Sequence, residues 1–326
     1  MKYKSNSIQK YIIAGDKKLH QDDFTGAIEE YSKAINIDQE NSNVYYDRGM
    51  AYFLNNENLL ALKDISMGIK LDVSNTKGYM LRILINKAIK DYLWAISDYS
   101  KLIEIEPMES ENYLYRGEIK LKTDDYKGAL SDFNIAIEIN PDNAEAYILR
   151  ADVKVSLNNR ISAFDDYSRA ARINPKDSLS VIERGEIREF FGDDKGAYDD
   201  YSKAIEIDPE YSWAYFCRAM LAHVYDVNDE AIHDLNKAIE LDPDNPGYLN
   251  MRGLCKQNIS DYDGAISDYS KAVVLDAEWE EPFFNRGFAK ACLGDRSGAL
   301  EDFDLALAIK PDYKDALEER NLILGI

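Results

Sequence analysis

The chain has 326 residues, of which 45% are hydrophobic, and carries a net charge of −21 from 60 acidic and 39 basic residues. Such an excess of negative charge argues against nucleic-acid binding through phosphate neutralisation and against binding to anionic membranes. No segment approaches the roughly 20 consecutive apolar residues of a transmembrane helix, and the N-terminal residues lack the apolar run of a secretory signal. We therefore expect a cytoplasmic protein that is not inserted into a membrane.

An alanine recurs every 34 residues along the chain, with no inserted or missing residue. The nine alanines are Ala27, Ala61, Ala95, Ala129, Ala163, Ala197, Ala231, Ala265 and Ala299. Self-similarity at a fixed period is typical of repeat proteins, in which one small unit is stacked many times. The period also gives each residue a position from 1 to 34, with the alanine at position 20 and residue 8 at position 1 of the first unit.

The residues around each alanine predict two helices per unit. Tyr31 and Ala34 follow Ala27 by four and seven residues, which places all three on one stripe of a helix, and the same spacing recurs in later units. A proline twelve residues after the alanine ends this helix in six units, at Pro107, Pro141, Pro175, Pro209, Pro243 and Pro311. An upstream helix carries glycine or another small residue at position 8, which indicates close contact between the two helices. Turn clusters such as Thr123-Asp124-Asp125 separate the helices.

This pattern resembles the tetratricopeptide repeat family. The likeness is close in YLYRGEIKLKTDDYKGALSDFNIAIEINPDN (113–143) and in FNRGFAKACLGDRSGALEDFDLALAIKPD (284–312), and it extends over residues 8–313. It implies an all-α, right-handed superhelical α-solenoid whose first helices line a concave face that grips a peptide or helix of a partner. The predicted units are 8–41, 42–75, 76–109, 110–143, 144–177, 178–211, 212–245, 246–279 and 280–313, and residues 314–326 form a C-terminal capping helix.

The candidate binding residues lie at positions 2, 5, 9 and 12 of the first helices, which helical spacing places on one stripe. We call these positions the first-helix stripe. In chain order it offers Tyr46, Met50 and Phe53 in the second unit, then Glu118, Asp152 and Glu186 in the fourth to sixth, then Trp213, Phe216 and Met220 in the seventh, and Phe284 in the ninth. Aromatic residues and methionine around an acidic stretch are typical of a peptide-binding groove. The alternative is that these side chains only pack between neighbouring first helices.

A second series recurs in eight units from the second to the ninth. Arginine stands at position 7, as Arg48, Arg82, Arg116, Arg150, Arg184, Arg218, Arg252 and Arg286, and aspartate at position 23, as Asp64, Asp98, Asp132, Asp166, Asp200, Asp234, Asp268 and Asp302. The first unit departs at both places, with Ala14 and Glu30. We expect the two series to form a ladder of ion pairs between helices, because guanidinium matches carboxylate bidentately. The alternative is two separate solvated series.

No catalytic constellation is present in the sequence. The three histidines, His20, His223 and His233, form no metal-ligand spacing with the three cysteines, and there is no phosphate-binding or nucleophile motif. We expect Cys217, Cys255 and Cys292 to behave as small buried hydrophobic residues. The sequence therefore predicts a protein that is not an enzyme and binds no cofactor or metal.

These observations predict a non-catalytic scaffold or adaptor that binds a protein or peptide partner on its concave face. The acidic stripe residues favour a basic or amphipathic partner, although acidity also serves the solubility of a long array. Two alternatives remain open: a homo-oligomeric structural array joined through its ends, and a regulatory subunit of a separately encoded enzyme. The apolar residues at the end of the capping helix, Leu317, Leu322, Ile323 and Leu324, either dock on the ninth unit or form a self-association patch.

Overall fold

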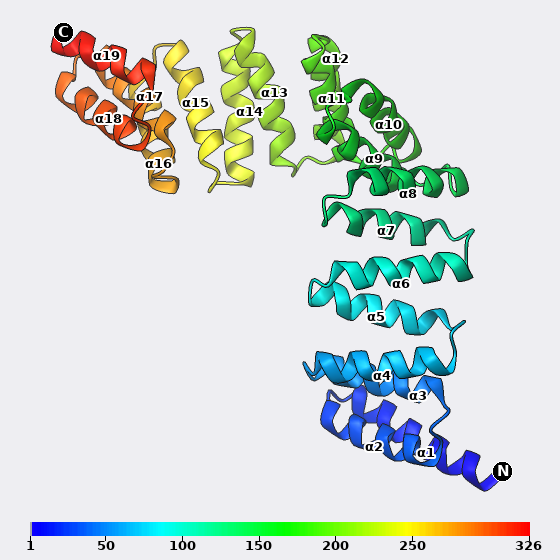
Figure 1. Cartoon of the computed structure of the whole chain (residues 1–326). Coiled ribbons are helices and arrows are strands. Elements are labelled where there is room, and N and C mark those ends of the chain that lie inside the picture. Colours follow the sequence, from blue (N-terminus) through cyan, green and yellow to red (C-terminus); the bar gives the residue numbers. More distant parts are fainter. Residues whose placement is uncertain (1) are drawn as a thin grey trace. The chain divides into compact units, whose positions relative to one another are not determined.

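The computed structural model describes residues 2–326, and the side chains from residue 7 onward. These residues form nineteen α-helices and no β-strand, which confirms the all-α class (Figure 1). In chain order they are α1 Lys2–Leu19, α2 Phe24–Ile37, α3 Ser42–Leu54, α4 Asn58–Leu71, α5 Thr76–Ala88, α6 Tyr92–Ile105, α7 Ser110–Leu121, α8 Tyr126–Ile139, α9 Ala144–Ser156, α10 Arg160–Ile173, α11 Ser178–Phe190, α12 Asp194–Ile207, α13 Ser212–Val224, α14 Asn228–Leu241, α15 Pro246–Asn258, α16 Tyr262–Leu275, α17 Glu280–Cys292, α18 Arg296–Ile309 and α19 Lys314–Leu324.

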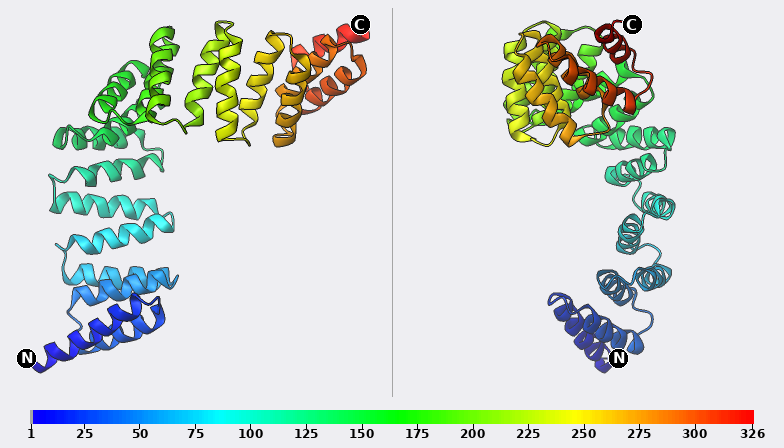
Figure 2. Two further views of the ribbon diagram at one scale, coloured as in Figure 1. Left: turned by 180° about the vertical axis from the view of Figure 1, so that it is seen from behind. Right: turned by 90° about the vertical axis from the view of Figure 1, so that its left-hand side faces the viewer.

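The helices stack in the order of the chain, as an α-solenoid. Each odd-numbered helix packs against the even-numbered helix that follows it, and neighbouring pairs contact one another in turn (Figure 2). The chain divides into two compact units, Met1–Asp166 and Tyr167–Ile326, and the division falls within α10. Each unit is described by itself below. At the start of the chain α1 begins at Lys2, ahead of the predicted first boundary at residue 8.

The turn between the two helices of a pair depends on two local devices. The residue at position 15 has a positive φ, between 57° and 86°, in all nine pairs; these residues are Asp22, Asn56, Lys90, Asp124, Asn158, Gly192, Asp226, Ser260 and Gly294. Directly after it, an aspartate such as Asp125 caps the second helix by accepting a hydrogen bond of 2.9 Å from the Gly128 amide. A Cβ at residue 128 would lie 2.0 Å from Asp125 Oδ2, so the glycine is what lets the cap close on the helix.

The core runs along the interface between the two helices of each pair. All nine recurring alanines are completely buried. At Gly117, on the facing helix α7, a Cβ would come within 2.7 Å of the Phe133 ring, and Gly253 has the same relation to Tyr269 at 2.5 Å. The small residues therefore let the helices approach until one large ring fills the remaining space, as their recurrence predicts.

The predicted ladder of arginine and aspartate is confirmed. In each of the eight pairs the arginine donates from Nε and Nη2 to the two carboxylate oxygens of the aspartate sixteen residues later, at 2.5–2.9 Å. The aspartates are between 1% and 6% exposed. A hydrogen bond to Asp98 raises the pKa of Arg82 above its ordinary value. These bidentate pairs join the two helices of one pair.

The arginines also connect consecutive helix pairs, which the sequence argument missed. Arg116 Nη1 donates to Ser100 Oγ of the preceding second helix at 3.0 Å, and Arg150 Nη1 donates to Asn134 Oδ1 at 2.7 Å. The signal was present at position 25, which holds serine or asparagine from the first unit to the eighth. Each of these arginines therefore spans two successive even-numbered helices.

The C-terminal helix α19 covers the last pair only in part. Ala316 is completely buried against it, but Leu322 is 75% exposed and Ile326 is 83% exposed. The expectation that Leu322 docks is wrong, because α19 turns this residue outward. Of the cysteines, Cys217 and Cys255 are buried as expected, whereas Cys292 is exposed at the end of α17.

Candidate functional site

The predicted stripe residues fall into two groups, one in each compact unit. Glu186, Trp213, Phe216, Met220 and Phe284 lie in the second unit, on α11, α13 and α17. Tyr46, Met50, Phe53, Glu118 and Asp152 lie in the first unit, on α3, α7 and α9.

In the second unit the structure brings four stripe and neighbouring residues into one continuous chain of contacts. Trp213 Nε1, in the first turn of α13, donates a hydrogen bond of 3.0 Å to Glu186 Oε1 on α11. The Trp213 and Phe216 rings lie 5.0 Å apart, and Phe216 lies 5.0 Å from Tyr248 on α15. These are tilted, offset ring contacts of the kind that stabilise aromatic clusters. We call Glu186, Trp213, Phe216 and Tyr248 the acid–aromatic row.

The acid–aromatic row remains accessible from outside. Trp213 is 38% exposed and Met220, one helical turn beyond Phe216, is 36% exposed, while Phe216 is half-buried and Tyr248 is buried. The row therefore offers an aromatic surface that is already held in place by its neighbours. Preordered side chains of this kind lose little conformational entropy when a partner binds.

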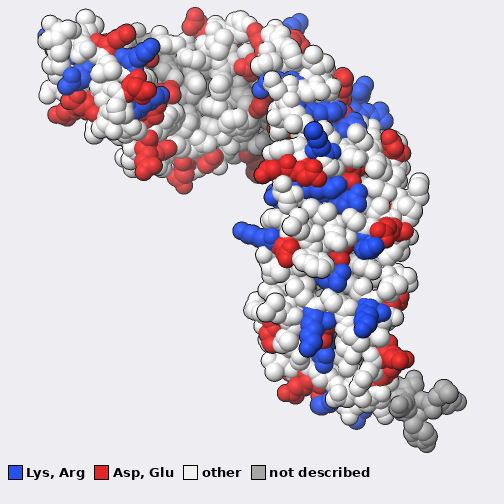
Figure 3. Space-filling model, in the orientation of Figure 1, with Lys and Arg blue, Asp and Glu red and all other residues white. Residues whose placement is uncertain are grey.

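Carboxylates of α11 give this surface a negative character. Burial raises the pKa of the Cys217 thiol well above its ordinary value, and the nearby charges of Glu186 and Glu189 raise it further. Burial also raises the pKa of Tyr211, with the charge of Glu183 adding to it. The three glutamates thus act on the same side of α13 that carries the aromatic residues. The face drawn in Figure 3 is mostly uncharged over α13 to α15, with acidic side chains along its edge.

Phe284 takes part in packing as well as in the surface. Its ring lies 5.2 Å from the ring of Tyr313, 5.8 Å from that of Phe303 and 6.4 Å from that of Phe288. Phe284 is half-buried and belongs to the cluster that α18 and the α19 turn cover. Its substitution would therefore affect stability together with any binding.

A buried polar network between α15 and α17 was missed in the sequence. Asn285 Nδ2 donates to Asn250 Oδ1 at 3.0 Å, and Asn250 Nδ2 donates to Glu281 Oε1 at 3.1 Å. Asn250 and Asn285 are 3% and 6% exposed. The signal was the pair of asparagines at positions 5 and 6 of the last two units, where most other units have apolar residues.

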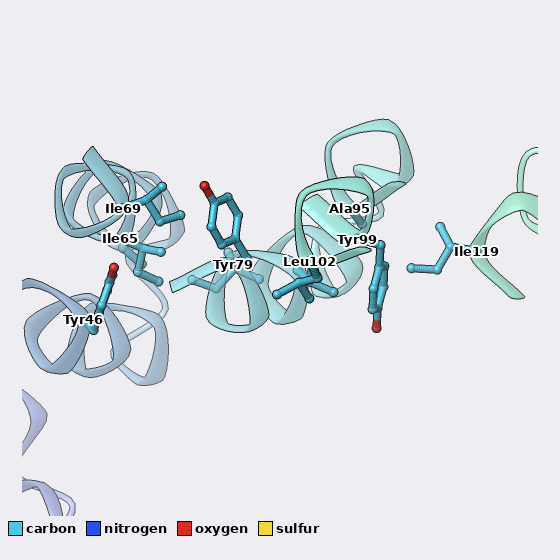
Figure 4. Close-up of a cluster of buried hydrophobic side chains, with 11 residues drawn as sticks. Tyr46, Ile65, Ile69, Tyr79, Ala95, Tyr99, Leu102 and Ile119 are labelled. Carbon is cyan, nitrogen blue, oxygen red and sulfur yellow. The ribbon is translucent and has the colours of Figure 1, made fainter. Parts of the chain in front are cut away.

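In the first unit Tyr46 lies in the core and is not available to a partner. It is completely buried, and its ring occupies the space left by two glycines, Gly68 and Gly78, where Cβ atoms would lie within 2.7 Å of it. Figure 4 shows the ring pointing toward Ile65. The packing alternative therefore holds for this residue. Met50 and Phe53 on the same helix are half-buried, and Phe53 packs against the Tyr46 cluster.

The acidic residues of the first unit lie on α7 and α9. Burial raises the pKa of Tyr115, and the charges of Glu111, Glu145 and Glu118 raise it further, so these carboxylates face one tyrosine. Glu118 is half-buried and Asp152 is exposed. This group of acids has no contact with an aromatic row like that of the second unit among the interactions of the described residues.

The described residues contain no group of three or more His, Cys, Asp or Glu side chains placed to hold a metal ion. Across residues 2–326, no helix has the length and apolar character needed to cross a membrane.

Two family models match the chain, one described as TPR repeat over residues 15–56 and one described as Tetratricopeptide repeat over residues 228–245. Both fall on helix pairs with the packing described above. The chain is a tetratricopeptide repeat protein. No curated protein sequence matches this tetratricopeptide repeat protein.

Solved structures of other repeat proteins resemble this tetratricopeptide repeat protein. YrrB, described as a TPR protein with an unusual peptide-binding site, is 25% identical with a TM-score of 0.51, over 58% of this chain and 97% of its own. PilF of Pseudomonas aeruginosa is 16% identical with a TM-score of 0.58, over 65% of this chain and 97% of its own. A chain of the APC/C hetero-tetramer Cut9–Hcn1 is 14% identical with a TM-score of 0.57, over 95% of this chain and 74% of its own. The last two likenesses concern the fold alone. Together with YrrB, the fold makes this tetratricopeptide repeat protein a protein-interaction scaffold in general terms.

Proposed function

We propose that the protein is a non-catalytic adaptor that binds a basic, amphipathic peptide or helical segment of a partner protein on the concave face of its solenoid. In this proposal the nine predicted units, 8–41 to 280–313, form one right-handed array, and the stripe of their first helices is the binding surface. The peptide-binding site that YrrB is described as having supports this kind of partner.

The acid–aromatic row carries the proposal. Trp213 and Met220 are exposed and Phe216 half-exposed, so they present apolar surface to the apolar side of an amphipathic segment. Glu186 lies within hydrogen-bonding distance of Trp213, and so brings a carboxylate to the edge of that apolar surface. A cationic side chain beside an apolar one on the partner would satisfy both. In the first unit Met50, Phe53, Glu118 and Asp152 are proposed as further contacts, without the buried Tyr46.

Peptide selection with the full chain tests the proposal. A library of random peptides is displayed against the wild-type protein, and the affinity of each selected peptide is then measured for Trp213→Ala and Phe216→Ala. We expect selected peptides that combine Lys or Arg with apolar residues, and affinities at least about tenfold lower for both variants, because interface aromatics contribute on the order of 2 kcal/mol.

Trp94→Ala is the matched control, because Trp94 is also exposed, at 57%, but lies on α6 outside the first-helix stripe. Selected peptides whose affinity is the same for wild type, Trp213→Ala and Phe216→Ala would rule out the proposed surface.

A homo-oligomeric array is the second candidate, and the exposed end of α19 favours it. Leu322, Leu324 and Ile326 are 75%, 45% and 83% exposed there. Sedimentation of the wild type over a range of concentrations is the test. Self-association that is removed by Leu322→Glu would support this candidate, whereas a monomer at every concentration would exclude it.

A further inference from the structure

A second cation reaches the ladder aspartate in five helix pairs. The basic residue stands at position 11 of the first helix, and its nitrogen lies 2.6–2.8 Å from the carboxylate in Lys120–Asp132, Lys154–Asp166, Arg188–Asp200, Lys256–Asp268 and Lys290–Asp302. The same nitrogen of Lys120 donates to the Gly128 carbonyl at 3.3 Å, and the other four make the equivalent contact. Each of these aspartates therefore accepts from an arginine and from a second basic side chain.

The pair α13–α14 lacks this second cation. Ala222 stands at position 11, 34 residues after Arg188 and 34 before Lys256. Within the described residues the ladder aspartate Asp234 is paired with Arg218, at 2.7 Å, and with no lysine. Two earlier pairs also lack a basic residue here, but they carry Tyr52 and Asn86, whose side chains are much larger than the methyl group of Ala222.

A pocket lies where the missing side chain would run. It has a volume of about 460 Å³, with Ala222, Tyr225 and Val227 on one side, Tyr198 and Asp199 of α12 on the other, and Glu230 of α14 at one end. A second pocket, of about 390 Å³, is lined by Asp234 and Arg218 and shares Tyr198 and Glu230 with the first. The two pockets therefore adjoin and lead from the surface beside Ala222 to the buried Asp234.

The walls of this path suit a long cationic side chain. Tyr198, Tyr225 and Ala222 offer apolar surface for a chain of methylene groups, and the tyrosine rings also attract a cation. Four charged groups line the wider pocket, the acids Asp194, Asp199 and Glu230 and the single base Lys195. Tyr225 Oη donates to Asp194, which fixes the tyrosine at the pocket wall.

We propose that this pocket accepts a lysine side chain of a protein partner, which takes the place that Lys120, Lys154, Lys256 and Lys290 occupy in the other pairs. The ammonium group reaches Glu230 and Asp234, and the methylene groups lie against Tyr198 and Ala222. The pocket lies between α12 and the turn from α13 to α14, so it is separate from the first-helix stripe and does not depend on the function proposed for that stripe.

The test follows the Ala222 methyl group by NMR in full-length protein with ¹³C-methyl-labelled alanine. Nα-acetyl-lysine amide is titrated in, with Nα-acetyl-norleucine amide as a probe of nearly the same shape without the charge. We expect a saturable shift of the Ala222 signal with the lysine compound, and none with the norleucine compound. An equal response to both, or no saturable response to lysine, would overturn the proposal.

Two variants locate the cation. Glu230→Gln keeps the size of the side chain and is expected to weaken lysine binding about two- to fivefold, as for a partly exposed ion pair. Ala222→Lys supplies the cation internally and, followed through the tyrosine signals of the pocket, is expected to abolish the response. Ala277→Lys, at an exposed site outside the pocket, is the control and should bind as the wild type does. Unchanged binding in Glu230→Gln contradicts the proposal even if Ala222→Lys does not fold.

Discussion

Trp213 donates its indole hydrogen to Glu186 across the boundary between two successive helix pairs, with 3.0 Å between Nε1 and Oε1. The two residues stand 27 positions apart in the sequence, and their contact joins the acidic helix α11 to the aromatic helix α13. It makes a carboxylate part of an aromatic surface, and it accounts for the proposed preference for basic partners.

Glu186→Gln should keep the hydrogen bond to Trp213 and remove only the charge. We expect the affinity for a selected basic peptide to fall about two- to tenfold at low salt, and its dependence on salt concentration to weaken, because one attractive charge is lost. Fluorescence titration at two salt concentrations measures both effects. Glu206→Gln on α12 is the control, since Glu206 is exposed and lies on a second helix. Equal losses in the two variants would mean that only net charge matters.

Asp132→Ala should be strongly destabilising, because it leaves the half-buried Arg116 and Lys120 without their shared carboxylate. We expect a loss of about 3–5 kcal/mol in the free energy of unfolding, as for other broken buried ion pairs. Urea unfolding followed by circular dichroism measures it. Asp304→Ala removes the carboxylate of a much more exposed pair, Arg320–Asp304, and should cost about 0–1 kcal/mol. Similar losses for the two variants would show that the ladder is no stronger than a surface pair.

Gly117→Ala should destabilise the protein although alanine favours helices. The added Cβ would lie 2.7 Å from Phe133 Cε1, so the ring must move from its packed position. We expect a loss of about 1–3 kcal/mol from overpacking, larger than the gain of about 0.5–1 kcal/mol in helix propensity. Thermal unfolding gives the sign directly. The double variant Gly117→Ala, Phe133→Leu should recover part of the loss relative to Phe133→Leu alone, and a stabilised single variant would show that the helices can separate freely.

The three thiols should differ sharply in their reaction with a thiol reagent. Burial raises the pKa of Cys255 to about 12, and burial with the charge of Glu186 raises the pKa of Cys217, so neither forms appreciable thiolate at pH 8. Cys292 is exposed and should react first. Because the folded pKa values are raised, the buried thiols stabilise the fold below the pKa of an unfolded thiol, and this contribution is lost as the pH rises above it. Absorbance of the released reagent should show one thiol in the native protein and three in denaturant. Fast native reaction of Cys292→Ser would contradict this.

The fold was largely predictable because its determinants are periodic. The alanines, the position 8 glycines and the arginine–aspartate series each recur at one spacing, and each makes the same contact wherever it occurs. The stripe was less predictable, because exposure there depends on the neighbouring pair. Tyr46 is buried by Gly68 and Gly78, whereas Met80, at the same position in the next unit, is 52% exposed. No pattern within one helix reports the size of the residues that face it.

The two-way grip of the ladder arginines makes the length of the solenoid adjustable. Arg150 holds Asp166 in its own pair and Asn134 in the pair before it, while Arg116 holds Asp132 and Ser100 in the same way. If the 34 residues from 110 to 143 were excised, Arg150 would meet Ser100 in place of Asn134, and both are hydrogen-bond acceptors. Gene duplication or loss of whole units would leave every junction chemically complete, whereas an insertion of any other length would put the arginine out of register with both partners.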